Sequence, residues 1–280
     1  MQGESRASLA KAKDDLDALI GHISPEGDGG MRKADVAELA DQLFAVQHVL
    51  DREISLRRAF TDPSSSASAR AGLAGRLFGG QVSGTATEIL ANLVSSAWAA
   101  PRDIVDAVEQ LAVQALYSVA LAEGTLDDVE DELFRFGRIV DREPALLLAL
   151  TDPSAGIDRR LALVDRLLDG KATDTTKRLV RELVVSPRGQ TFGVNLAEYV
   201  RLAAERRDRL VARVTAAVPL TEEQSSRLAA ALAAQLGRQV HLNVELDPAV
   251  VGGMTIQIGD TVYDGSVASR LADAHRRLTR

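Results

Sequence analysis

The chain has 280 residues, of which 46% are hydrophobic and 26% charged, and its net charge at pH 7 is -7. This composition is typical of a globular protein with room for two or three modest domains. The acidic balance argues against nucleic acid as the main partner, because contact with phosphates needs a basic face. The absence of cysteine excludes disulfides, thiolate metal sites and cysteine nucleophiles.

The first part of the chain is predicted to be helical. We expect an opening helix over residues 5–20 and a glycine-rich loop over residues 24–30. Apolar residues then recur at alternating intervals of three and four, a stripe that places one face of a helix against a core. They are Val36, Leu39, Leu43, Val46 and Leu50. The motif Thr61-Asp62-Pro63 ends this helix, because the residue before a proline is pushed out of the α-helical region.

The chain matches itself at a spacing of 90 residues. Residues 35–98 and 125–188 share 21 identities in 64 positions without a gap, whereas composition alone would give roughly five. The motif Thr61-Asp62-Pro63 recurs as Thr151-Asp152-Pro153. The apolar stripe recurs in register at Leu126, Val129, Leu133, Phe136 and Val140. A period of 90 is too long for a solenoid, so the sequence predicts two similar helical bundles in tandem.

Two shorter helices are expected to complete each copy. They cover about residues 68–78 and 84–97 in the first copy, and about 157–169 and 173–185 in the second. A further helix, from about 189 to 209, is expected to connect the second bundle to the rest of the chain.

The pattern changes after residue 210. Apolar residues alternate from Leu210 to Ala216 and again over residues 240–246, as in half-buried strands. Between them, Thr221 and Gln224 form a capping box that begins a helix. A glycine turn, a strand from Met254 and a helix capped by Ser266 are expected to follow. The fold class predicted is mainly α with a small α+β C-terminal domain. The predicted parts are a first bundle (1–100), a second bundle (101–189), a connecting helix (190–209) and the α+β domain (210–280).

Two further features concern membranes and export. No uninterrupted apolar run approaches the ~20 residues that a membrane span needs, and the longest conspicuous one covers residues 145–150. The first residues are charged and lack the apolar centre of a secretory signal. Any work at a membrane is therefore expected to depend on another chain.

Several motifs that suggest chemistry have simpler explanations. The apolar residue within the acidic run over residues 127–132 falls on the helical stripe, so the acids occupy the other faces of the helix. We interpret them as a solvated helix face and not a cation site. The Gly252-Gly253 pair lacks the lysine of a phosphate-binding loop and indicates a turn into a strand. The four histidines lack metal-ligand spacing. Trp98 is expected in the core, with a role as a partner anchor as the alternative.

The C-terminal third resembles the delta subunit of F-type ATP synthase, a family known in mitochondria as the oligomycin-sensitivity-conferring protein. The residues that carry this resemblance most specifically are Asp247, Gly252, Gly253, Ile256, Asp264 and Ser266. The similarity extends from about residue 107 to 280, because the second copy is similar to the family's N-terminal helical domain. The additional first copy is similar to the long form of this subunit in some high-GC Gram-positive bacteria.

The resemblance implies a non-catalytic stator subunit with no cofactor and no metal. Such a subunit holds the N-terminal helices of alpha subunits and the end of the b subunit at the cytoplasmic face of the bacterial plasma membrane. We expect a groove for an alpha-subunit helix in the second copy. Its predicted lining is Val108, Leu111, Ala115, Leu179, Val180 and Leu183. The alternative is that these six residues are simply the core of the bundle.

The role of the first copy and two rival functions stay open. The first copy either holds a second alpha-subunit N-terminus or braces the stalk. One rival function is a helical adaptor unconnected with ATP synthase. The other is an enzyme that uses the C-terminal domain, which the absence of convergent catalytic motifs disfavours.

Overall fold

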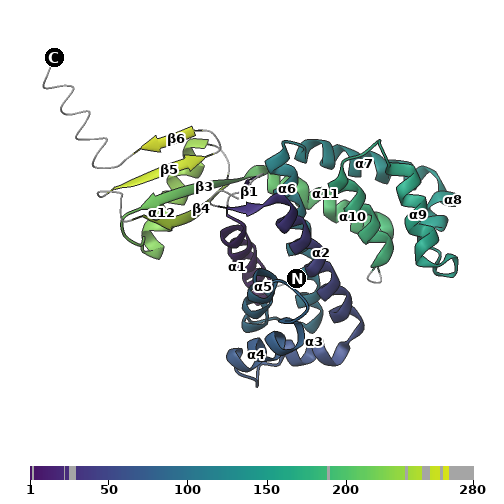
Figure 1. The fold of residues 1–280 in the computed structure, drawn as a ribbon, viewed down its shortest axis with the longest axis horizontal. Helices are drawn as coiled ribbons and strands as arrows, with labels where there is room; N and C mark the ends of the chain where they lie inside the picture. Colours follow the sequence, from purple (N-terminus) through teal and green to yellow (C-terminus); the bar gives the residue numbers. More distant parts are fainter. Residues whose placement is uncertain are drawn as a thin grey trace, which may run out of the picture. The chain divides into compact units, whose positions relative to one another are not determined.

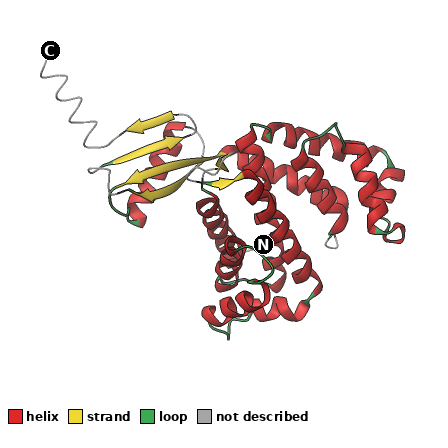
Figure 2. Cartoon of the chain, in the orientation of Figure 1, coloured by secondary structure: helices red, strands yellow, loops and turns green. Residues whose placement is uncertain are grey.

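The computed structural model describes residues 1, 3–21, 23–24, 30–187, 190–236, 239–247, 253–258 and 261–264. The chain divides into two compact units, Met1–Arg206 and Arg207–Arg280. The protein is mostly helical (Figures 1 and 2), in agreement with the predicted fold class. The predicted loop over residues 24–30 falls largely on residues that the structure does not describe.

The first unit is built almost entirely of helices. Its N-terminal part contains α1 (Gly3–Ile20), β1 (Ile23–Ser24), β2 (Met31–Arg32), α2 (Lys33–Arg52), α3 (Ile54–Thr61), α4 (Ala67–Phe78), α5 (Gly84–Ser95) and α6 (Pro101–Glu123). Its second part contains α7 (Leu126–Arg142), α8 (Pro144–Thr151), a 3-10 turn (Pro153–Ala155), α9 (Ile157–Leu168), α10 (Asp174–Val185) and α11 (Phe192–Asp208). Figure 1 shows α1 to α5 in one group and α7 to α10 in another.

The two predicted apolar stripes both face the core. All five stripe residues of α2, from Val36 to Leu50, are buried, and so are all five of α7, from Leu126 to Val140. One continuous cluster of buried residues extends from Leu9 to Ala203. The two parts of the first unit therefore share one hydrophobic core.

The helix that carries each stripe ends earlier than the sequence predicted, at Arg52 in α2 and at Arg142 in α7. A single helix up to Thr-Asp-Pro was expected, but the backbone leaves the helical region at Glu53 and Glu143, and α3 and α8 begin anew. At Glu143 the cause is Pro144, which restricts the residue before it. In the first copy the side chain of Arg57 donates to the carbonyl oxygens of Leu50 and Asp51, which satisfies the end of α2.

Helix α6 lies at the centre of the first unit. It packs against α1, α2, α3, α5, α7 and α10, and all residues from Leu111 to Ala120 are buried. A helix buried all round is covered by neighbours on every face. Gly124, with φ of 70°, ends it in the left-handed conformation that glycine adopts without strain.

Among the described helices, α6 alone is long and apolar enough, by length and composition, to cross a membrane. The apolar stretch of α6 is not an uninterrupted run, because charged residues such as Asp106 and Glu109 stand within the helix. Some 83% of its apolar window is buried inside the protein. A core helix has the same properties, so α6 by itself is weak support for a membrane span.

Within its described residues, the second unit contains a four-stranded sheet with one helix packed on it (Figure 2). Its elements are β3 (Arg209–Ala216), α12 (Glu222–Leu236), β4 (Gln239–Leu246), β5 (Met254–Ile258) and β6 (Thr261–Asp264). The strand order is β4-β3-β5-β6, with β3 parallel to β4 and antiparallel to β5. A helix connects the parallel pair, as such pairs require.

Sequence patterns of the second unit agree with its structure. Thr221 and Gln224 form the predicted capping box, because the backbone nitrogen of each donates to the side chain of the other at 2.9 and 3.2 Å. Alternate residues of β3 (Ala212, Val214 and Ala216) are buried. The helix expected after Ser266 lies outside the described residues.

Candidate partner-binding surface

The six residues predicted to line a groove lie deep in the first unit. Val108, Leu111 and Ala115 of α6 and Leu179 and Val180 of α10 are fully buried, and Leu183 is 2% exposed. In this conformation they are core residues, which corresponds to the alternative named with the prediction. Their part in partner binding stays a prediction.

Helix α2 lies antiparallel along the full length of α6. At one end, Lys33 Nζ lies 2.5 Å from Glu123 Oε1, which joins the start of α2 to the end of α6. At the other end, Arg102 near the start of α6 forms an ion pair with Asp51 near the end of α2. These contacts fix α2 on α6 at both ends.

The same helix also contacts α10. Arg178 Nη1 lies 2.8 Å from Asp41 Oδ2, and His48 Nε2 lies 2.5 Å from Glu182 Oε1. One turn beyond, Gln47 Nε2 donates to Ser186 Oγ at 3.4 Å. These three contacts join α2 to α10 and to Ser186 directly after it through long side chains, whereas α2 packs most closely against α6.

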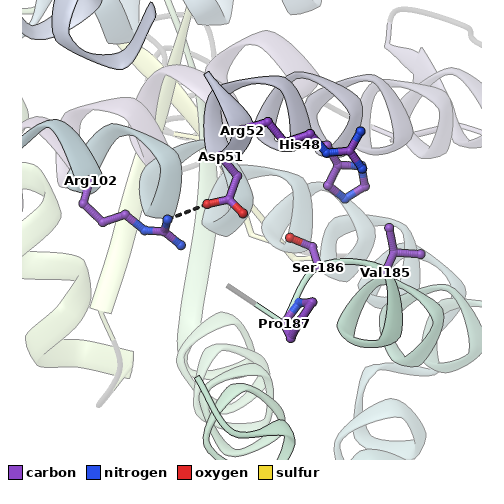
Figure 3. Close-up of a pocket in the computed structure, with 7 residues that line it drawn as sticks. All are labelled: His48, Asp51, Arg52, Arg102, Val185, Ser186 and Pro187. Atoms are coloured by element: carbon purple, nitrogen blue, oxygen red, sulfur yellow. Dashed lines mark hydrogen bonds and ion pairs between the residues drawn. The ribbon is translucent and has the colours of Figure 1, made fainter. Parts of the chain in front are cut away.

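A polar cavity of about 390 Å³ opens at the end of this contact (Figure 3). Its lining consists of His48, Asp51, Arg52, Arg102, Val185, Ser186 and Pro187. Arg102 is paired with Asp51, the one carboxylate of this lining, whereas Arg52 extends toward His48 and away from that carboxylate (Figure 3). The cavity can therefore accept polar groups, although the charge of Asp51 is already neutralised by Arg102.

Arg178 of α10 and Asp165 of α9, which faces Arg181, are held in their ionised forms. Burial lowers the pKa of Arg178, but hydrogen bonds to Asp174 and Asp41 outweigh it and leave that pKa raised. The hydrogen bond from Arg181 holds the pKa of Asp165 below its ordinary value. The contact between α2 and α10 thus includes the ion pair of Arg178 with Asp41, which persists at neutral pH.

The residues that carry the family resemblance lie in the second unit. The Asp247 backbone nitrogen donates to the Ala216 carbonyl at 3.0 Å, which extends the pairing of β3 with β4. Gly253 has φ of 80°, in the region that favours glycine, directly before β5. Ile256 is half-buried opposite Val214 on β3. Asp264 ends β6, while Gly252 and Ser266 lie outside the described residues.

The motifs that suggested chemistry have structural roles wherever they can be seen. Within the described residues, no group of three or more His, Asp or Glu side chains could hold a metal ion. In the acidic run, Asp127 and Asp128 are exposed, and Glu132 accepts from the Thr173 backbone nitrogen at the start of α10. Trp98 is 8% exposed and donates to the Leu93 carbonyl, so it belongs to the core.

Sequence analysis missed the contact between α2 and α10. One signal was available, because Phe44 and Phe134 are identical in the two copies and both stand outside the apolar stripe. A large apolar residue repeated off the core face indicates a second buried face. Phe44 is 5% exposed, as such a signal would indicate, whereas Phe134 is 53% exposed, so the signal holds for the first copy alone.

Comparison with known proteins agrees with this picture. Helical units are a recurring class of protein-binding module, because grooves between helices can receive a partner's helix. The family model described as "ATP synthase delta (OSCP) subunit" matches residues 108–278. The chain belongs to this family. It is accordingly a non-catalytic subunit type, as the resemblance implied.

Curated relatives match over nearly their whole length. ATP synthase subunit delta of Streptomyces avermitilis is 54% identical over 99% of this chain and 98% of its own. The same subunit of Streptomyces coelicolor is 50% identical over 99% and 98%. That of Thermobifida fusca is 43% identical over 99% of both chains. The similarity therefore includes residues 1–107, which the family model leaves unmatched.

Proposed function

We propose that this chain is a stator subunit of an F-type proton-transporting ATP synthase. It connects the catalytic head to the peripheral stalk, so that the head stays still while the rotor turns and rotation is coupled to ATP synthesis. The observation that carries the proposal is 54% identity to an ATP synthase subunit delta over 99% of this chain. An identity of that level over both units supports a shared role for the whole molecule.

The proposed partners are the N-termini of alpha subunits and the end of the b subunit. A helical unit suits the first partner, since grooves between helices receive amphipathic helices. We assign the end of the b subunit to the small α+β unit as its proposed partner. We place the chain at the cytoplasmic face of the bacterial plasma membrane, attached only through these subunits and acting as one copy in a hetero-oligomer.

We also propose that the helical unit arose by duplication. Three pairs of helices support this, because α3 and α8, α4 and α9, and α5 and α10 begin and end exactly 90 residues apart. The bend after α3 and the turn after α8 support it too. In each, the aspartate Oδ1 accepts from the backbone nitrogen and hydroxyl of the serine two residues on, Asp62 with Ser64 and Asp152 with Ser154.

Longer-range hydrogen bonds support the same proposal. The Gln42 side chain accepts from the Ser83 backbone nitrogen, and Glu132 accepts from that of Thr173, each across 41 residues. Arg70 donates to the carbonyl of Val94 and Arg160 to that of Val184, each across 24 residues. Contacts of this kind depend on tertiary structure, so their recurrence goes beyond a similarity of helical pattern.

The proposed parts are residues 1–100, 101–189, 190–209 and 210–280. The first two are the copies, and the third carries the chain to the α+β domain. Because α6 packs against helices of both copies, we regard the copies as repeated in sequence but joined in one compact unit.

The test uses membranes from a strain that lacks this chain. We expect the catalytic head to detach at low salt and ATP hydrolysis to lose its coupling to proton pumping, with both restored by the full chain. In a pull-down, the tagged chain should recover alpha and b subunits. A head that stays bound and coupled without the chain would contradict the proposal, and recovery of neither subunit would favour a general helical adaptor.

A further inference from the structure

The helices that carry the two apolar stripes differ in burial along one line only. Residues 36–51 of α2 and 126–141 of α7 form sixteen pairs at a spacing of 90, and in ten of them both residues are equally buried, half-buried or exposed. In the other six pairs the residue on α2 is always the more buried one. On α7 these six residues are Asp127, Glu130, Phe134, Gly137, Arg138 and Asp141. Apart from one adjacent pair they follow one another at intervals of three or four, so they share one side of the helix, which we call the open stripe.

The aromatic residue of the open stripe shows how large the difference is. Phe44 on α2 is 5% exposed, whereas Phe134 at the same place on α7 is 53% exposed. The guanidinium of Arg138 lies 5.9 Å from the centroid of the Phe134 ring. Away from this line the two helices agree, because Val49 is 40% exposed and its counterpart Ile139 is 52% exposed. One side of α2 is therefore covered within the unit, and the same side of α7 is open.

The open stripe is also more acidic than its counterpart on α2. The corresponding residues of α2 are Ala37, Ala40, Phe44, Gln47, His48 and Asp51. They include one carboxylate, whereas three carboxylates and one guanidinium give the open stripe a net charge of -2 at pH 7. Beside it, Asp131 and Arg135 form an ion pair and neutralise each other. Solvation accounts for the acids of the open stripe, but it gives no reason for an exposed ring at their centre.

We propose that the open stripe binds an amphipathic helix of another subunit, with Lys or Arg side chains on both sides of an apolar one. The apolar side chain packs on Phe134, and the basic side chains face the carboxylates of Asp127 and Asp141. These two residues are fourteen positions apart, so a partner helix about 21 Å long covers the open stripe. The inference rests on the proposed function, since the partner belongs to the same assembly. It adds a contact that is separate from the six predicted groove residues and from the α+β unit.

Two pairs of variants of the full chain test this surface. In each pair one residue belongs to the open stripe, and its control lies on the same helix at a position that is exposed in both copies. The pairs are Phe134→Ser with Ile139→Ser, and Asp127→Lys with Asp128→Lys. Asp127 and Asp128 both lie in the first turn of α7, so the effect of the helix dipole is similar for both. All four residues are exposed, and we expect unchanged melting temperatures, which circular dichroism checks.

The measurement is the affinity of each chain for membranes of the strain that lacks it. We expect Phe134→Ser to lower the affinity at least about tenfold and Asp127→Lys at least about threefold, with both controls within about twofold of the unaltered chain. The loss from Asp127→Lys should shrink as salt is raised, because ions screen a contact between charges. Stripe variants that bind as well as their controls would overturn the inference. An unaltered chain that does not bind contradicts the proposed function, and the inference falls with it.

A photochemical cross-link identifies the occupant. Benzoylphenylalanine replaces Phe134 in the full chain, or Ile139 as the control, and the joined peptide is sequenced after irradiation of the rebuilt membranes. We expect a link from position 134 alone, to a segment of another subunit with Lys or Arg residues at helical spacing. The inference is wrong if position 134 forms no link, or if it links to an acidic segment, to a second copy of this chain or to residues 207–280 of the same chain.

Discussion

Phe44 and Phe134 offer a comparison within one molecule of the same side chain in two environments. We expect Phe44→Ala to destabilise the protein by about 3–5 kcal/mol, because it removes a buried aromatic ring and leaves a cavity in the core. Phe134→Ala should change stability by no more than about 0.5 kcal/mol, since that ring is 53% exposed. Urea unfolding followed by circular dichroism measures both. Equal losses in the two variants would contradict the difference in burial between Phe44 and Phe134.

Single residues also show which features of the structure could be predicted from the sequence. The stripe residues and the Thr221 capping box were predictable, because their signals depend on spacing along one helix. The end of α2 was not, because it depends on Arg57 reaching back to the carbonyls of Leu50 and Asp51. The predicted groove residues were placed on the right helices, but their burial depends on how α6 and α10 pack with the rest of the unit, which no local pattern specifies.

At the scale of elements, a buried ion pair joins α1 to α11. Arg206 Nη1 lies 2.5 Å from Asp17 Oδ1, and the side chains are 6% and 2% exposed. Lys13 and Glu205 form a second, more exposed pair at 3.8 Å between the same helices. The opening helix of the first copy is therefore attached to the helix that leads out of the second.

Removing one partner of the buried pair should cost more than removing both. We expect Asp17→Ala to destabilise the protein by roughly 3–5 kcal/mol, because it leaves the Arg206 charge buried without its carboxylate. The double variant Asp17→Leu, Arg206→Met should recover much of that loss, since no buried charge remains. The matched control, Lys13→Ala, breaks the exposed pair and should cost less than about 1 kcal/mol. A double variant no more stable than Asp17→Ala would contradict this account.

The order of elements was easier to predict than their association. Periodicity and capping signals identified most of the helices and the strands β3, β4 and β5, because such signals are local. Nothing local indicates that α6 serves both copies, although ten consecutive buried residues are consistent with it. The sequence therefore suggested two bundles in tandem, while packing places both in the unit Met1–Arg206.

For the whole molecule, the shared position of α6 means that the first copy cannot be removed cleanly. A fragment of residues 101–280 would lose α1 to α5 and expose the side of α6 that they cover. Each large apolar side chain returned to water costs about 1.5–3 kcal/mol, and a few of them approach the total stability of a domain, about 5–15 kcal/mol. The loss of function expected from such a deletion would therefore report unfolding as well as a missing contact.

Calorimetry and dye binding can check this dependence. We expect the fragment 101–280 to melt well below the full chain and to bind the dye ANS, which reports exposed apolar surface. The matched control is the fragment 1–206, which keeps the whole first unit and should melt near the full chain without binding the dye. If 101–280 melts as high as the full chain and leaves the dye unbound, the second copy folds on its own.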